Sequence, residues 1–230
     1  MFKAANYLNP EDFDKFLGSF DGMNNYKAKP ELLRLAAQIE YYCALRISEV
    51  LTLRKEDFDL NHRILTLQHT KTGHKRCKCS TWDYTDSHSK VKTKLISVDE
   101  SCKKCKGTAK IRIKQYTSIP KPLIGILSIH LQTIKGDKPL FQFGRITAWK
   151  YYKQAGVKAN LEIRELQKER SIEGVWTHLL RKSYLKFMRN NGASVELCEV
   201  KARHIERHSI DHYLRPDIES LKIWEAKIFD

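Results

Sequence analysis

The residues best suited to chemistry lie in three separate stretches of the chain. ALRISEVLTL contains Arg46, and THLLRKSYLKFMRNNG contains a His-x-x-Arg pair, His178 and Arg181. ARHIERHSIDHYL contains His204 and, further on, Tyr213. Breaking a phosphodiester without a metal requires a nucleophile, positive charge on the phosphoryl oxygens and a proton for the leaving oxygen. Guanidinium groups match phosphate oxygens, histidine moves protons, and a tyrosine hydroxyl is a nucleophile.

The order and spacing of these motifs resemble the tyrosine recombinase (phage integrase) family. In that family an arginine, a hairpin lysine, a His-x-x-Arg pair, a second histidine and a tyrosine act together on DNA. The separations of Arg181 from His204 and of His204 from Tyr213 are those of typical members, and the resemblance covers about residues 8 to 220.

The resemblance implies a role for each residue. Arg46 and Arg181 would bind the phosphoryl oxygens, and His204 would donate a hydrogen bond to a non-bridging oxygen. His178 would take or return the tyrosine proton. Tyr213 would attack phosphorus and form a 3′-phosphotyrosine with a free 5′ hydroxyl, so that a second 5′ hydroxyl could reverse the step and join new strands without ATP.

The leaving 5′ oxygen needs a proton, which the family takes from a hairpin lysine. Lys71, in TKTGHK, fits that place best, and Lys75 and Lys114 remain alternatives because the hairpin carries an insert. Glu49 is predicted to orient Arg46 or a histidine from outside the reacting groups.

The third stretch departs from the family pattern at one position. Members usually have Leu-Gly-His where this chain has Ala-Arg-His, so Arg203 replaces a glycine. A metal site built from the clustered histidines is disfavoured, because a fourth ligand and a carboxylate are missing. We expect a basic surround for DNA, made of Arg203, Arg207, His208, His212 and Arg215.

Four of the six cysteines cluster in two close pairs. Two such pairs supply the four thiolates of a tetrahedral zinc site, with His74 or His88 as a substitute for one thiol. The alternative is four unligated surface thiols. We expect a structural zinc in an insert spanning residues 74–110, and no cofactor for catalysis. The predicted ligands are Cys77, Cys79, Cys102 and Cys105.

The composition favours a polyanionic partner. The 230 residues include 42 Lys+Arg against 27 Asp+Glu, which gives a net charge of +15. Lysine and arginine side chains that neutralise DNA phosphates release counterions, so double-stranded DNA is the simplest partner. An anionic membrane surface is disfavoured, because no basic amphipathic stretch has a clean apolar face. No signal peptide or membrane span is evident, so we expect a cytoplasmic protein of a prokaryotic or virus-infected cell.

Hydrophobic periodicity predicts an α+β fold: a mainly helical catalytic domain over residues 1–230 with a small antiparallel sheet and the cysteine-bearing hairpin insert. Residues 159–174 are expected to form a solvated helix or an extended loop. Because few residues precede Arg46, we expect the N-terminal core-binding domain to be absent, and the chain could be a fragment of a longer protein. Helices are predicted near residues 10–20, 30–45, 46–60, 122–134, 145–156, 177–192, 194–204 and 216–230, and strands near 63–71 and 109–120.

The predicted function is site-specific DNA recombination or integration. One alternative is a type IB topoisomerase-like enzyme that nicks and reseals DNA, and another is a non-catalytic zinc-containing DNA-binding module. We expect a homotetramer on DNA and a monomer in isolation. The amphipathic segment DIESLKIWEAKIFD is a candidate for exchange with a neighbouring subunit.

Overall fold

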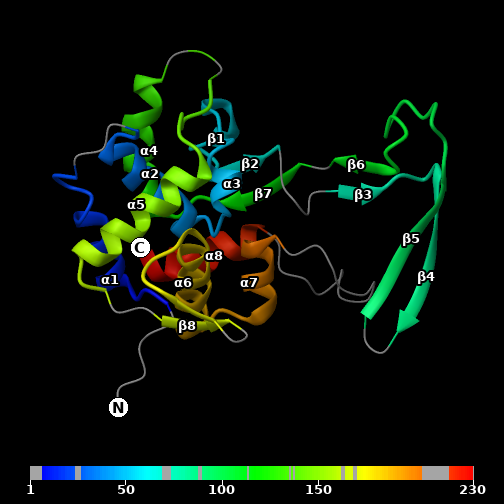
Figure 1. Cartoon of the computed structure of the whole chain (residues 1–230). Helices are drawn as coiled ribbons and strands as arrows, with labels where there is room; N and C mark the ends of the chain where they lie inside the picture. The colour runs from blue at the N-terminus through cyan, green and yellow to red at the C-terminus, as the bar shows by residue number, and fades with distance from the viewer. Residues whose placement is uncertain are drawn as a thin grey trace. The chain divides into compact units, whose positions relative to one another are not determined.

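A computed structural model of the chain divides into two compact units (Figure 1). The first comprises residues 1–67 and 116–230, and the second comprises residues 68–115. The structure describes residues 7–23, 27–68, 74–87, 90–112, 114–134, 136, 138–161, 164–167, 170–203 and 218–229.

The first unit is mainly helical, as the sequence predicts. A three-stranded sheet in the order β1-β2-β7 and a separate two-stranded hairpin accompany the helices. The helices are α1 (Pro10–Gly18), α2 (Pro30–Tyr42), α3 (Ile47–Val50), the 3₁₀ turn η1 (Lys55–Asp57), α4 (Lys121–Thr133), α5 (Arg145–Lys158), α6 (Thr177–Asn190), α7 (Val195–Ala202) and α8 (Ile218–Phe229). The strands are β1 (Phe58–Asp59), β2 (Ile64–Leu67), β7 (Gln115–Ser118), β8 (Arg164–Gln167) and β9 (Arg170–Glu173).

Helix α1 begins where its capping residues place it. The Asn9 side chain accepts a hydrogen bond from the Asp12 backbone N–H at 2.8 Å, and Pro10 occupies the first turn. Proline is tolerated there because that backbone position has no helical acceptor. The predicted start of the first helix is therefore confirmed.

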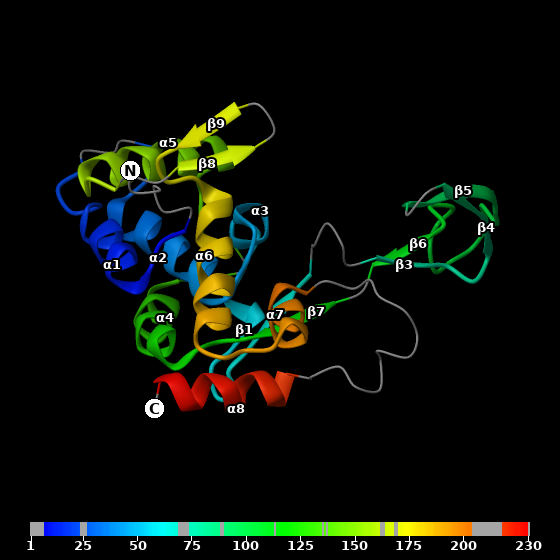
Figure 2. The same ribbon diagram turned by 90° about the horizontal axis from the view of Figure 1, so that it is seen from below.

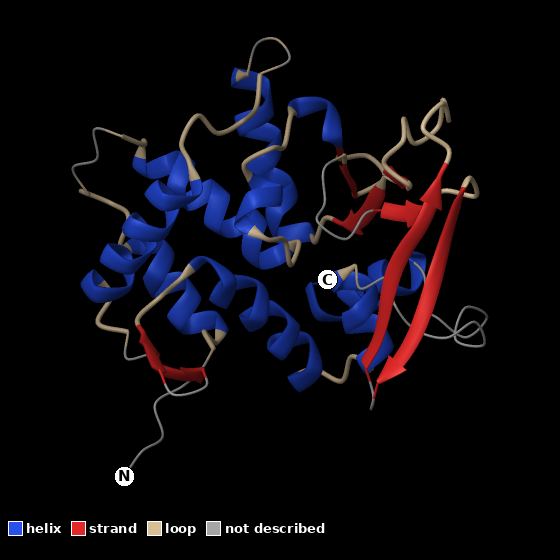
Figure 3. Cartoon of the chain, turned by 45° about the vertical axis from the view of Figure 1, so that its right-hand side comes forward, coloured by secondary structure: helices blue, strands red, loops and turns tan. Residues whose placement is uncertain are grey.

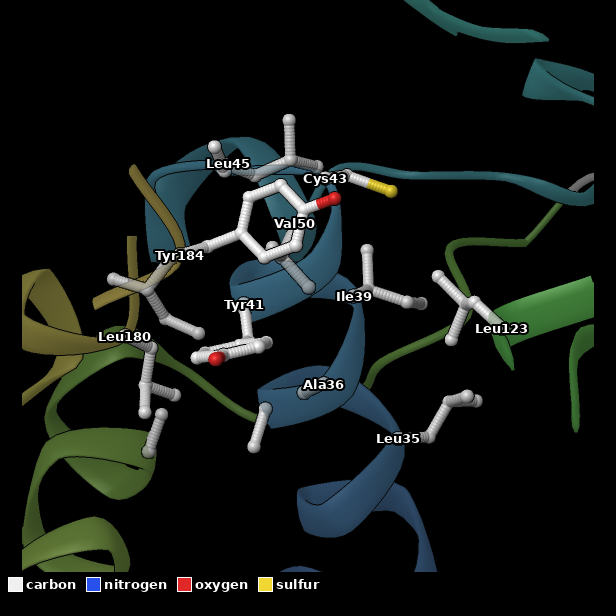
Figure 4. Packing of buried hydrophobic residues seen from close by; sticks show 14 of the residues in the cluster. Leu35, Ala36, Ile39, Tyr41, Cys43, Leu45, Val50, Leu123, Leu180 and Tyr184 are labelled. Atoms are coloured by element: carbon white, nitrogen blue, oxygen red, sulfur yellow. The ribbon is translucent and has the colours of Figure 1, made fainter. Parts of the chain in front are cut away.

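Helix α2 forms the centre of the hydrophobic core and packs against α6. Figure 4 shows Ile39 and Tyr41 of α2 among Leu180 and Tyr184 of α6, all buried. The Tyr41 and Tyr184 rings meet edge to face with centroids 5.4 Å apart. This packing fixes α6 against the turn that follows α2, and both segments carry predicted site residues.

The helix predicted from Arg46 to residue 60 is wrong in length. Helix α3 covers only four residues, and Arg46 is its N-cap. The Glu49 carboxylate accepts a hydrogen bond from the Arg46 backbone N–H at 2.9 Å, which stabilises the start of this single turn. Beyond it, Arg54 makes an isolated antiparallel bridge to Pro139, so the chain turns away from a helical path.

The prediction for residues 159–174 is also wrong. This segment forms the antiparallel hairpin β8–β9, with Arg164 opposite Glu173 and Glu165 opposite Ile172 in register.

The C-terminal helices follow the predicted positions. Gly192, with a φ of 82°, follows the last turn of α6, and the Ser194 hydroxyl caps α7 by accepting the Leu197 N–H at 3.1 Å. Helix α8 packs against α7 and α4 of the same chain with Leu221 buried (Figure 2).

The second unit contains two antiparallel pairs, β3–β6 and β4–β5, drawn as red arrows in Figure 3. The predicted insert lies within this unit and has more strand structure than its polar sequence indicates. Its strands are β3 (His74–Arg76), β4 (Ser80–Ser87), β5 (Lys90–Val98) and β6 (Lys110–Arg112).

Candidate active site

Arg46 lies on the exposed side of a charged cluster at the start of α3, and the buried Glu49 pairs with it. The Arg46 guanidinium donates to Glu49 Oε1 at 3.0 Å, and the Arg46 backbone N–H donates to Glu49 Oε2. The Arg46 side chain is 27% exposed, whereas that of Glu49 is 2% exposed. Glu49 therefore holds Arg46 from below, while part of the guanidinium stays open to solvent.

Arg181 lies beneath this pair on α6, and its side chain is 3% exposed. Its guanidinium donates to the Ala44 carbonyl at 2.7 Å and to the Ala202 carbonyl at 2.6 Å. A guanidinium nitrogen of Arg181 also lies 4.0 Å from Glu49 Oε2. Arg181 thus joins the turn after α2 to the end of α7, and the fold brings it together with Arg46 as the sequence predicts.

Arg203 is a third arginine of the same cluster, which corrects its predicted place in a basic surface. It is buried, and its guanidinium donates to Glu49 Oε2 at 2.8 Å. Its backbone is left-handed, with a φ of 54° and a ψ of 43°, directly after α7.

The cluster lowers the pKa values of both Glu49 and Arg181, for different reasons. Burial alone would raise the pKa of Glu49, but Arg203, the Arg46 backbone N–H and the guanidinium groups of Arg46 and Arg181 together lower it. Burial, with repulsion from Arg203 and Arg46, lowers the pKa of Arg181 to about 9. A positive charge under such repulsion is stabilised by an incoming anion.

A second carboxyl, Glu40 of α2, is fully buried beside the cluster. Burial raises its pKa well above the ordinary value, although Arg181 opposes the shift. Three guanidinium groups, those of Arg46, Arg181 and Arg203, face two carboxyl groups, so these described residues carry excess positive charge even when both carboxyls are ionised.

His178 lies one helical turn before Arg181 on α6 and is exposed. Lys71, His204 and Tyr213, like His208 and His212, fall outside the described residues. Of the alternative lysines, Lys75 lies on β3, and Lys114 lies exposed between β6 and β7.

The four predicted zinc ligands converge in the second unit. Their sulfur atoms all lie within 4.8 Å of one another. The Cys77 and Cys102 sulfurs are 3.7 Å apart, and those of Cys79 and Cys105 are 3.4 Å apart. A disulfide needs about 2.05 Å, whereas a tetrahedral zinc about 2.3 Å from each sulfur sets the sulfurs about 3.8 Å apart. The spacing fits zinc, and His74 and His88 are not needed to complete the ligand set.

The backbone holds both cysteine pairs in place. The Cys77 N–H donates to the Ala109 carbonyl at 2.9 Å, which links the end of β3 to the start of β6. The Lys106 N–H donates to the Cys102 carbonyl, and Gly107 follows with a φ of 74°. Backbone N–H groups lower the pKa of Cys102 to about 7, whereas burial and hydrogen bonds with the neighbouring thiols raise the pKa of Cys79.

A buried polar network that sequence patterns did not reveal joins α7 to α8. Lys201 and Glu225 are both fully buried, and the Lys201 ammonium donates to Glu225 Oε1 at 2.6 Å. Ser118 and Tyr184 donate to the same oxygen at 2.9 and 3.3 Å. This network fixes the last helix on its own chain.

Comparison with solved structures shows a shared fold. The catalytic domain of bacteriophage HP1 integrase matches with a TM-score of 0.52 and 17% identity, covering 92% of this chain and 88% of that chain. The integrase of mycobacterium phage Brujita matches with a TM-score of 0.59 and 11% identity, covering 100% of this chain and 60% of that one. The Tn1549 transposon integrase in complex with a circular intermediate DNA matches with a TM-score of 0.54 and 14% identity, covering 98% of this chain and 66% of that one. A search of curated protein sequences gave no significant match.

The fold and the arginine cluster define a catalytic domain of the tyrosine recombinase class. A sequence model of the phage integrase family matches residues 7–219, and the chain belongs to that family. Its function is accordingly that of a site-specific DNA recombinase. Among the described residues, no helix is long and apolar enough to cross a membrane.

Proposed function

We propose that the chain cleaves and rejoins double-stranded DNA through a covalent link between Tyr213 and a 3′ phosphate. The observation that carries the proposal is the cluster of Arg46, Glu49 and Arg181, which α3 and α6 bring together in a member of the phage integrase family. Excess positive charge at partly buried guanidinium groups favours a phosphate over a neutral ligand.

In this mechanism side chains of the protein supply the nucleophile, the positive charge and the proton transfers. Arg46 and Arg181 stabilise charge on the phosphoryl oxygens, and His204 donates to a non-bridging oxygen. The Tyr213 hydroxyl attacks phosphorus while His178 accepts its proton, and Lys71 protonates the departing 5′ oxygen. A second 5′ hydroxyl then attacks phosphorus and breaks the phosphotyrosine bond; its proton passes to the neutral Lys71, and His178 returns its proton to the Tyr213 oxygen.

A nicked suicide substrate tests this proposal. Such DNA loses a short fragment after cleavage, so the protein–DNA adduct accumulates and survives denaturant. We expect an adduct with the wild type, and a rate about 10²–10³ lower for Arg46→Ala because one charge contact to the phosphate is lost. Arg145→Ala is the matched control, since Arg145 is exposed at the start of α5. No adduct with the wild type, or equal rates for the two variants, would contradict the proposal.

We also propose that the second unit binds one structural zinc through its four clustered cysteines. The sulfur spacing supports a closed tetrahedral site, which leaves no position for substrate. Metal analysis of the purified protein should give one zinc per chain. Cys105→Ser should lower this value, whereas Cys198→Ser, outside the cluster, should not; a wild-type value well below one would refute the site.

The DNA-bound form is proposed to be a homotetramer that acts in the cytoplasm of a prokaryotic or virus-infected cell. The partner assignment is supported by the net charge of +15 and by the DNA present with the Tn1549 integrase. Light scattering of the free chain and of its DNA complex tests the assembly. A DNA complex containing one chain would contradict it.

A further inference from the structure

The buried guanidinium of Arg203 hydrogen-bonds to several segments that carry the arginine cluster. It donates to the carbonyls of Cys43 and Lys201 at 3.3 and 3.0 Å through one terminal nitrogen. Through the other it donates to the Ala44 carbonyl at 3.3 Å and to Glu49 Oε2. One side chain thus links the turn after α2, the end of α7 and helix α3.

These contacts determine which groups form hydrogen bonds with the Glu49 carboxylate. A carboxylate oxygen has two lone-pair positions. For Glu49 Oε2 they are taken by the Arg46 backbone N–H at 2.9 Å and by Arg203 at 2.8 Å. Arg181 is left at 4.0 Å, beyond hydrogen-bond distance. With Arg203 in place, Glu49 Oε2 is hydrogen-bonded to the Arg46 backbone and to Arg203, and its contact with Arg181 is a longer ion pair.

The backbone of Arg203 indicates that this placement is specific. A left-handed conformation is strained for a residue with a Cβ atom, and it persists only when surrounding contacts fix it. The four contacts of the guanidinium supply that constraint. Residue 203 is also where the chain leaves α7 toward the predicted site residue His204.

We propose that Arg203 is a positioning residue that holds Glu49 on Arg46 and fixes the two backbone segments to which Arg181 is hydrogen-bonded. Its four hydrogen bonds are to Glu49 and to carbonyls of the chain itself, so we assign it no contact with phosphate. The proposal rests on the proposed function for the reaction, but the Arg203–Glu49 coupling can be measured without DNA.

The central variant is Arg203→Gly, which relieves the left-handed strain while removing the guanidinium. We expect it to form the suicide-substrate adduct about 100-fold more slowly under single-turnover conditions, since a small misplacement of reacting groups has effects of this size. Affinity for the same DNA should change less than about 3-fold, because Arg203 makes no phosphate contact. Added methylguanidinium should restore part of the adduct-formation rate of Arg203→Gly and should not alter the rate of the wild type. The rate of Arg203→Lys should lie between the rates of Arg203→Gly and the wild type.

Arg63→Gly is the matched control. Arg63 has the same left-handed backbone, with a φ of 55°, and its guanidinium also donates to a carbonyl, that of Ile119 at 3.2 Å, and pairs with Glu225 at 3.8 Å. Arg63→Gly should leave the adduct rate within about 3-fold of wild type, since neither of these contacts is to the arginine cluster. A wild-type rate for Arg203→Gly, or no recovery with methylguanidinium, would overturn the proposal.

A double-mutant cycle separates this proposal from the proposed function. Arg203→Gly and Glu49→Gln should be non-additive in DNA-free thermal unfolding, because the two side chains bond directly. If the wild type forms no adduct, the proposed function is wrong, and the double-mutant cycle remains as the test of the Arg203–Glu49 contact. Additive effects of the two substitutions on unfolding would then overturn the proposed positioning role of Arg203.

Discussion

Replacing Glu225 with alanine should strongly destabilise the first unit. Its carboxylate accepts hydrogen bonds from Lys201, Ser118 and Tyr184, and both Glu225 and Lys201 have no exposed surface. Alanine leaves the Lys201 ammonium buried, with only the Ser118 hydroxyl and carbonyl as hydrogen-bond partners among the contacts described here.

The size of the effect follows from this burial. Removing one partner of a buried ion pair costs about 3–5 kcal/mol, because the remaining charge stays uncompensated. For a chain of this length about 1 kcal/mol corresponds to roughly 2–4 °C in Tm. We therefore expect Glu225→Ala to lower Tm by about 10 °C. The double variant Lys201→Met/Glu225→Leu should recover most of the loss, since two apolar side chains of similar size replace the two fully buried charges, and the partly exposed Arg63 loses only an ion pair of 3.8 Å to Glu225.

Thermal unfolding followed by circular dichroism measures these differences. The control is Glu219→Ala on the same helix, where Glu219 is exposed and pairs with Lys222 at 2.7 Å. Exposed pairs contribute about 0–1 kcal/mol, so this variant should stay near the wild-type Tm. If Glu225→Ala also stays near it, or if the double variant is less stable than Glu225→Ala, the reasoning about the buried pair is wrong.

Three further perturbations test other parts of the structure. The free energy of unfolding of Glu40→Gln, measured by denaturant titration, should rise relative to that of wild type between pH 5 and pH 8. Because the pKa of Glu40 is raised in the folded chain, its stabilising contribution is present below its ordinary pKa and is lost as pH rises through the folded pKa. Glutamine does not ionise, so the variant does not lose stability in this way. An unchanged difference across this range would contradict it. Gly156→Ala should lower the free energy of unfolding by about 1–3 kcal/mol, because its Cβ would lie 2.7 Å from the Val175 side chain; a neutral effect would show that Val175 yields. A zinc chelator should expose the second unit to limited proteolysis while the first stays resistant, and equal cleavage with and without chelator would count against a structural zinc.

Local sequence signals predicted the elements whose causes are local. The helices predicted near residues 10–20 and 194–204 form as α1 and α7, where the side chains of Asn9 and Ser194 cap the first turns. The spacing of the cysteines predicted a cluster that the structure brings together. By contrast, α3 ends after one turn, and Arg54 beyond it bridges to the distant Pro139, a contact that apolar periodicity does not register.

The buried charges could not be predicted, because their partners are distant in sequence. Lys201 and Glu225 occupy helices where charged residues are usually solvated. Arg203 was noticed as a departure from the family pattern and assigned to a DNA-facing surface. Its burial depends on Glu49, Cys43 and Ala44, which meet it only in the folded chain.

The central claim is that Tyr213 is the nucleophile for a phosphate held by Arg46 and Arg181. Its most direct test is mass spectrometry of the suicide-substrate adduct after nuclease and protease digestion. The account predicts a peptide with a 3′-linked nucleotide on Tyr213, and no adduct from Tyr213→Phe. A nucleotide on any other residue, or an undiminished adduct from Tyr213→Phe, would contradict it.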